Sequence, residues 1–177
     1  MISRIILIGV LSVISNISCV YAGSTAIVLP KGILPVNDRV APPLKLSDVD
    51  GGLFNLEEYK GNWVFVHFWA SWCGPCRREI PAIQELIEIN KNKTLVFSII
   101  NTAENEDTIF NFLGVLAPDI ISLMDSDGLV TEAWAPRGLP STYLVDPSGF
   151  IRYQALGGRP WTKPGYLNFL NSLTEDN

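Results

Sequence analysis

The sequence is poor in residues that hold metals or form structural disulfides. Its 177 residues include only three cysteines and one histidine. A structural zinc site usually takes four Cys or His ligands. Cys73 and Cys76 form one C-x-x-C segment, so zinc would also need both Cys19 and His67. We therefore predict a protein without a metal and without another cofactor.

Charge is also scarce, and none of it is concentrated in a basic run. Charged residues make up 18% of the chain, and the formal net charge is −5. Nucleic-acid-binding surfaces need clustered Lys and Arg, so we exclude nucleic acid as a partner. The hydrophobic share of 47% is typical of a folded protein, and the length suits one domain with a full core.

The N-terminal segment lacks the uninterrupted apolar length of a stable membrane-spanning helix. Arg4 precedes an apolar run over 5–14, and residues 20–22 suit a cleavage site. This pattern predicts a signal peptide over 1–22 and a periplasmic or otherwise extracytoplasmic protein, with an uncleaved membrane anchor as the alternative. Cleavage would remove Cys19 and leave one cysteine pair, without a thiol for a structural disulfide.

Apolar periodicity divides the remaining chain into strands and helices. Residues 23–43 are rich in proline and show no clear period, so we predict a linker before a domain at 44–177. Two short apolar segments around a Gly-Gly turn predict a hairpin that covers one edge of a sheet. Alternating strands and helices imply parallel crossovers. The predicted strands are 64–69, 94–100, 120–124, 141–145 and 150–156, and the predicted helices follow the C-x-x-C segment and cover 109–116, 129–134 and 166–173.

The two neighbouring cysteines are the strongest chemical signal. An apolar and aromatic run over 64–69 leads into Cys73-Gly74-Pro75-Cys76, and a helical pattern follows. A thiol at a helix start lies near unpaired N–H groups and the positive end of the helix dipole, which stabilise its thiolate. We assign Cys73 as the nucleophile that attacks a partner's disulfide. Cys76 is then the thiol that resolves the mixed disulfide and forms the redox disulfide with Cys73.

These residues resemble a known family. Phe68-Trp69-Ala70, Trp72-Cys73-Gly74-Pro75-Cys76 and Pro81 are similar to thioredoxin, and the wider pattern resembles the TlpA/ResA group of extracytoplasmic thiol-disulfide oxidoreductases. The resemblance implies an α/β, thioredoxin-like fold in which helices flank a central mixed sheet. It also implies an N-terminal hairpin and an inserted βα unit.

The resemblance gives further residues a role at the site. Leu139-Pro140, directly before a predicted strand, looks like the family's cis-proline loop, which faces the cysteine pair in the folded domain. Proline donates no N–H, so the backbone of Leu139 is expected to pair with a substrate strand. We place Trp72, Gly74 and Pro75 at the substrate contact as well.

His67, the only histidine, stands where thioredoxin has a buried aspartate that moves protons at the second thiol. A neutral imidazole near Cys76 could accept its proton, because the pKa of histidine lies close to neutral pH. The alternative is a core histidine that is hydrogen-bonded to a neighbouring group.

Glu104 follows the second predicted strand, at a position where the TlpA/ResA group has an acidic residue beside its cysteines. There it could raise the pKa values of the thiols or relay a proton. The alternative is an exposed glutamate in the first turn of the next helix, where the helix dipole favours it.

The predicted function is an exported protein disulfide reductase that acts through Cys73 and Cys76. Gly-Pro between the cysteines is the thioredoxin dipeptide and favours a reductant. By resemblance, the partners are a membrane electron donor and disulfide-containing exported proteins, such as apocytochrome c or a copper-site protein. We expect a monomer, since no dimerisation segment is evident. A disulfide oxidase or isomerase is the alternative; a thiol peroxidase is disfavoured because Ala70 stands where its Thr or Ser would be.

Overall fold

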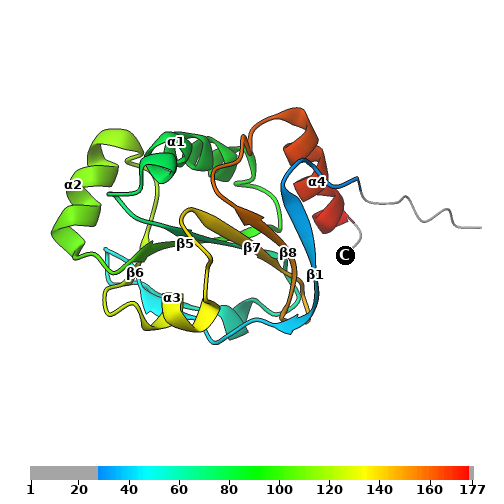
Figure 1. Cartoon of the computed structure of the whole chain (residues 1–177), viewed down its shortest axis with the longest axis horizontal. Helices are drawn as coiled ribbons and strands as arrows, with labels where there is room; N and C mark the ends of the chain where they lie inside the picture. Colours follow the sequence, from blue (N-terminus) through cyan, green and yellow to red (C-terminus); the bar gives the residue numbers. More distant parts are fainter. Residues whose placement is uncertain (1–27, 176–177) are drawn as a thin grey trace, which may run out of the picture.

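A computed structural model describes residues 28–175, which form one main sheet, a hairpin and several helices (Figure 1). The signal peptide predicted over 1–22 lies outside the described residues. The elements are β1 (Ile33–Val40), β2 (Lys45–Ser47), β3 (Leu53–Asn55), the 3-10 helix η1 (Leu56–Tyr59), β4 (Val64–Trp69), α1 (Gly74–Ile89), β5 (Val96–Thr102), α2 (Glu106–Leu116), β6 (Leu123–Asp125), α3 (Leu129–Trp134), β7 (Ser141–Val145), β8 (Phe150–Leu156) and α4 (Pro164–Glu175).

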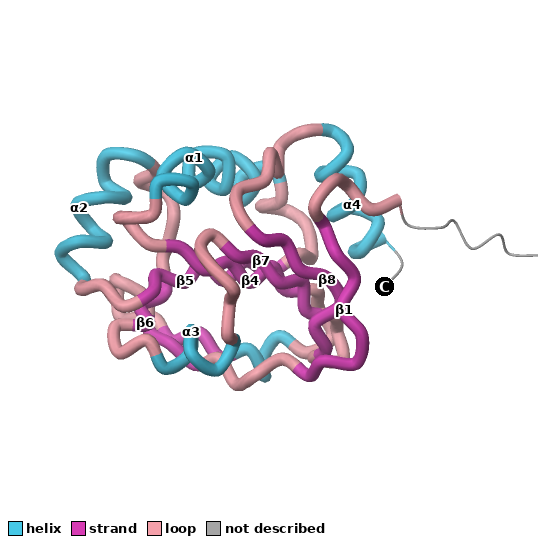
Figure 2. The backbone as a smooth tube through the Cα atoms, in the orientation of Figure 1, coloured by secondary structure: helices cyan, strands magenta, loops and turns pink. Residues whose placement is uncertain are grey.

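The main sheet has six strands in the order β1-β8-β7-β4-β5-β6. β4, β5 and β6 run parallel, whereas β7, β8 and β1 add antiparallel neighbours on the other side of β4. Figures 1 and 2 show α1, α2 and α4 over one face of this sheet and α3 over the other. The predicted mixed sheet flanked by helices is therefore confirmed.

β4 contributes to the cores on both faces, because successive side chains of a strand point in opposite directions. Phe65 and Trp69 belong to the core cluster that contains residues of α1, α2 and α4. Val66 and Phe68 belong to the cluster that contains Trp134 of α3 and residues of the hairpin. Every residue of β4 is buried, so His67 lies in the interior on the same face as Phe65 and Trp69.

Most predicted elements are confirmed. β2 and β3 form the hairpin, and a bridge between Asp48 and Leu123 holds it beside β6, at one edge of the sheet. The strands predicted at 64–69, 141–145 and 150–156 have the predicted bounds. β6 is shorter than predicted, and α2 and α4 begin earlier.

The linker predicted over 23–43 is wrong for residues 33–40, which form β1 and pair with β8. Prolines in this segment favoured a linker, but an edge strand tolerates proline because its outward N–H positions need no partner. Ile33 is only 5% exposed and pairs with Ala155. The folded domain therefore begins inside the segment that the sequence assigned to the linker.

Candidate active site

Cys73 and Cys76 lie at the start of α1, after the loop that follows β4. They are joined as a disulfide, with an S–S distance of 2.11 Å. Cys73 is the N-cap residue, and its Sγ accepts a hydrogen bond from the backbone N–H of Cys76 at 3.2 Å. Pro75 occupies the first turn, where its missing N–H costs little. The helix start thus offers Sγ of Cys73 an N–H donor and the positive end of the helix dipole.

The two sulfur-bearing residues differ in their access to solvent. Cys73 is 5% exposed, whereas Cys76 is fully buried. Beside them Trp72 is 69% exposed, and Pro75 is also exposed. A partner's disulfide can therefore approach Cys73 more easily than Cys76. This order of access is the one that the assigned roles of nucleophile and resolving thiol require.

The peptide bond between Leu139 and Pro140 is cis, as the resemblance predicts. Because Ser141 pairs with Phe68 in the sheet, this loop lies at the end of β4 from which the chain continues to the cysteines. The carbonyl of Pro140 accepts a hydrogen bond from the N–H of Gly157 at 2.8 Å. The cis-proline loop is therefore tied to the loop that follows β8.

A buried glutamate on α1 was not among the predicted site residues. Glu79 is 5% exposed and lies three positions after Cys76, on the same side of the helix. Its Oε1 accepts hydrogen bonds from the backbone N–H of Arg159 at 2.8 Å and from the indole N–H of Trp161 at 2.6 Å. Its Oε2 has no hydrogen-bond partner among the described residues. Burial raises the pKa of Glu79 to about 7, although the two hydrogen bonds and the charge of Arg159 oppose this shift.

His67 faces Glu79 in the interior. The imidazole Nδ1 lies 2.9 Å from the hydroxyl of Thr142, and Nε2 lies 3.9 Å from Oε2 of Glu79. Complete burial lowers the pKa of His67 to about 3. The hydrogen bond to Thr142 is the kind of contact that a core histidine needs, and the nearby carboxyl group was not foreseen. A proton-relay role for His67 stays a prediction.

Glu104 contacts the loop that leads to Cys73. Its Oε2 accepts hydrogen bonds from the backbone N–H of Ser71 and the side-chain amide of Asn101, both at 2.7 Å, and its Oε1 accepts one from the hydroxyl of Ser71. The alternative of an exposed first-turn glutamate is wrong, because Glu104 is half-buried and α2 begins at Glu106. Its predicted influence on the thiols stays a prediction.

Comparison with known proteins agrees with this arrangement. The Redoxin family model matches residues 35–170, which include the cysteine pair and the cis-proline. The chain belongs to the Redoxin family. Two of its relatives are named thiol-disulfide oxidoreductase ResA. The protein of Bacillus subtilis is 30% identical over 111 residues, and that of Geobacillus thermodenitrificans is 33% identical over 115. Each match covers 63% of this chain and 62% or 64% of the relative, so the chain spans just under two thirds of their length.

Solved structures of two other proteins have a similar fold. A Chlorobium tepidum structure assigned as thiol:disulfide interchange protein DsbE has a TM-score of 0.68 at 26% identity. The match covers 77% of this chain and 96% of the Chlorobium tepidum chain. The exposed lipoprotein thioredoxin Etrx1 of Streptococcus pneumoniae has a TM-score of 0.65 at 25% identity, over 75% of this chain and all of its own. The predicted thioredoxin-like fold is confirmed.

Two features are absent from residues 28–175 of this Redoxin-family chain. None of its helices there combines the length and the apolar character needed to cross a membrane. In the same residues, no three His, Cys, Asp or Glu side chains are grouped so that they could hold a metal ion.

Helical spacing is the signal that could have identified Glu79. It lies beside the apolar stripe of α1 that contains Ile80 and Ile83, three positions after Cys76. An acidic residue on the buried face of a helix is costly unless the fold provides partners. Those partners, Arg159 and Trp161, are 80 and 82 positions away in the sequence, so no local pattern indicates them.

Proposed function

We propose that this protein is an extracytoplasmic thiol-disulfide oxidoreductase that acts through Cys73 and Cys76. One observation carries the proposal: the disulfide lies at the N-terminus of α1, and its more accessible sulfur accepts the N–H of Cys76. After reduction, this N–H and the helix dipole would stabilise a thiolate on Cys73. The names of the ResA relatives support the same activity.

Reduction of a substrate takes two exchange steps. In the first, the thiolate of Cys73 attacks one sulfur of the substrate disulfide, and the other substrate sulfur leaves as a thiolate. In the second, the thiolate of Cys76 attacks Sγ of Cys73, releases the remaining substrate thiolate and forms the Cys73–Cys76 bond again. The substrate gains two electrons, and a dithiol donor protein must return two electrons to the pair.

Glu79 is the group that we assign to accept the proton of Cys76. Cys76 is fully buried, so its thiol cannot give a proton directly to solvent water. With a pKa of about 7, Glu79 can take up a proton near neutral pH and release it afterwards. His67, with a pKa of about 3, stays neutral there and is the weaker base. Glu79 is therefore the better candidate for the relay that the sequence suggested for His67.

We propose further that the pair acts as a reductant. The Gly-Pro dipeptide between the cysteines supports this direction. Export by the signal peptide over 1–22 would place the protein among substrates such as apocytochrome c or copper-site proteins, with a membrane protein as the dithiol donor. The substrate would contact Trp72, Gly74, Pro75 and the backbone of Leu139.

The equilibrium reduction potential tests this direction. Purified protein is titrated against a dithiol buffer while Trp fluorescence is recorded. A value below about −220 mV supports a reductant, and a value above about −150 mV assigns an oxidase or isomerase instead. The Cys73→Ser variant is the control, because it cannot form the disulfide and should show no transition.

Trapping the intermediate tests the two cysteine roles. With a model disulfide peptide, Cys76→Ser should accumulate a mixed disulfide through Cys73, because the resolving thiol is missing. Cys73→Ser should accumulate far less, since the remaining thiol is buried. Mass spectrometry of the adducts measures both. An adduct chiefly on Cys76 would reverse the roles, and no adduct in either variant would contradict the proposed activity.

A further inference from the structure

A groove of about 450 Å³ lies beside the cysteine pair. One wall comes from α1 and includes Pro75, Arg78 and the buried Glu79. The other wall comes from the segment between β8 and α4 and includes Arg159 and Lys163. A cavity of this volume has room for a substrate side chain.

The groove adjoins the surface where a substrate would meet the disulfide. Pro75 lines it and also stands between the two cysteines. The opposite wall begins at Gly158, and the neighbouring Gly157 donates its N–H to the carbonyl of Pro140. A peptide that pairs with the backbone of Leu139 while its cysteine reacts with Cys73 can therefore place an adjacent side chain in the groove.

The charge of the groove is opposite to that of the whole chain, which has a net charge of −5. Arg78 and Lys163 are exposed, and within residues 28–175 neither they nor Arg159 take part in an ion pair. The guanidinium of Arg159 donates hydrogen bonds to backbone carbonyls only. The acid in the lining, Glu79, is buried, and its Oε2 has no hydrogen-bond partner among the described residues. The groove thus presents cations to solvent without a matching exposed carboxylate.

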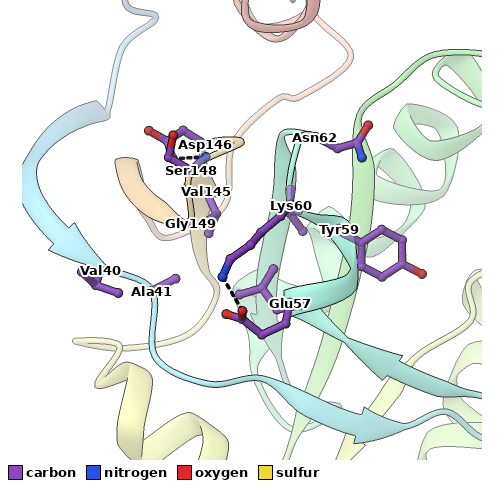
Figure 3. A pocket seen from close by; sticks show the side chains of 12 residues that line it. Val40, Ala41, Glu57, Tyr59, Lys60, Asn62, Val145, Asp146, Ser148 and Gly149 are labelled. Carbon is purple, nitrogen blue, oxygen red and sulfur yellow. Dashed lines mark hydrogen bonds and ion pairs between the residues drawn. The ribbon is translucent and has the colours of Figure 1, made fainter.

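In a second hollow of this protein, the lysine is already paired with a glutamate (Figure 3). This hollow lies at the Val64 end of β4, whereas the cysteines follow the Trp69 end. Its lysine, Lys60, is already paired with Glu57 of the same lining, as the dashed line in Figure 3 indicates. That hollow offers neither an unpaired lysine nor contact with the cysteine pair.

We propose that the groove between α1 and the β8–α4 segment binds an acidic side chain that flanks a cysteine of the substrate disulfide. The inference rests on the proposed function and adds a substrate class to it: exported proteins with Asp or Glu near the reactive cysteine. Complementary charge at the edge of such a contact directs which partner binds and how it is oriented. Arg78 and Lys163 are the specificity-determining residues of this contact.

Matched peptides test the proposal. Each peptide contains one intramolecular disulfide. The peptides differ at one position, which lies one or two residues from a cysteine and is Asp, Asn or Lys. A dithiol buffer returns two electrons to the Cys73–Cys76 pair after each turnover, and the rate without the protein is subtracted. Under these conditions kcat/KM for the best Asp peptide should exceed that for its Asn counterpart by about fivefold, the effect of one exposed ion pair. The Lys peptide should fall below the Asn peptide. High salt should reduce both differences.

Charge reversal identifies the residues responsible. Arg78→Glu and Lys163→Glu should each lower the Asp-to-Asn ratio of kcat/KM, and the double variant should bring it below one. Ratios within one variant are compared, so an effect of Arg78 on the rate of exchange itself cancels. Lys45→Glu, an exposed residue of the hairpin, changes the net charge equally and should keep the parent ratio.

The outcomes separate the two proposals. If no peptide is reduced, the proposed function fails. If all peptides are reduced with equal kcat/KM, or if Lys45→Glu alters the ratio as much as Arg78→Glu does, the function stands and the groove inference is wrong. Glutathione disulfide is the remaining probe: a higher kcat/KM for it than for the best Asp peptide would make a small anionic disulfide the occupant and would also overturn the inference.

Discussion

One glutamate follows the cysteine pair on α1 and another contacts the loop before it, and their surroundings differ. Glu79 follows Cys76 on α1, and one of its oxygens has two donors while the other faces the neutral imidazole of His67 without a hydrogen bond. Glu104 contacts Ser71, before Cys73, and both of its oxygens accept hydrogen bonds from Ser71 or Asn101.

This difference separates a carboxyl group with one unpaired oxygen from a carboxyl group that is hydrogen-bonded through both oxygens and holds a loop. A carboxyl group that is buried with one oxygen unpaired favours its neutral form. Glu79 is therefore suited to proton exchange near the thiols. Glu104 is suited to hold the Ser71 loop, and with it the approach to Cys73, in place. Three substitutions test this comparison.

The largest expected change in stability comes from substitution of His67, which faces Glu79. Its pKa falls from 6.5 to about 3 on folding, so below pH 6.5 the unfolded state binds a proton that the folded state does not. The parent should therefore lose stability relative to His67→Asn as the pH falls, by ~1.4 kcal/mol per unit and up to ~5 kcal/mol near pH 3. Urea unfolding from pH 7 to pH 3 measures the difference. A gap that does not change with pH would contradict a buried, neutral imidazole.

Glu79 should have the opposite pH dependence and a smaller effect. Its pKa rises from 4.5 to about 7 on folding, so the unfolded state releases its proton first as the pH increases. Relative to Glu79→Gln, the parent should lose ~3 kcal/mol between pH 4.5 and pH 7 and no more above that. His67 and Arg159 lie against this carboxyl, and each is present in both proteins.

An exposed glutamate of the same helix supplies the control for that measurement. Glu85→Gln should follow the parent's pH profile, because Glu85 is exposed.

The rate of disulfide reduction provides an independent check on Glu79. The parent's pH–rate profile should have an inflection near pH 7 that Glu79→Gln lacks. If the variant keeps it, Glu79 is not the proton acceptor.

The smallest expected effect belongs to Glu104. Glu104→Ala leaves the N–H of Ser71 and the amide of Asn101 without their acceptor and should cost ~2 kcal/mol at pH 7. Hydrogen exchange at the Ser71 N–H should become faster. Glu106→Ala, an exposed first-turn residue of α2, should cost less than ~1 kcal/mol. Equal losses of stability in Glu104→Ala and Glu106→Ala would mean that Glu104 contributes no more than an exposed surface glutamate.

Much of the fold was predictable because its signals are local. The run of apolar residues over 64–69, the C-x-x-C segment and the amphipathic helix follow one another without interruption, and β7 and β8 are separated by an Asp-Pro-Ser-Gly turn. β1 was missed, since its partner β8 lies more than a hundred residues further along the chain and its prolines argue against a strand. Whether such a segment becomes an edge strand depends on the strand that the folded sheet places beside it, and the local sequence does not show this.

The sequence by itself determined the C-x-x-C pair, its place at a helix start and, through family resemblance, the cis-proline loop before β7. These depend on residues that are close together in the chain. Only the tertiary structure decided which groups surround the pair, because His67, Glu79 and Trp161 come from three separate segments. Desolvation depends on all of these segments at once, so the raised pKa of Glu79 and the lowered pKa of His67 exist only in the folded protein.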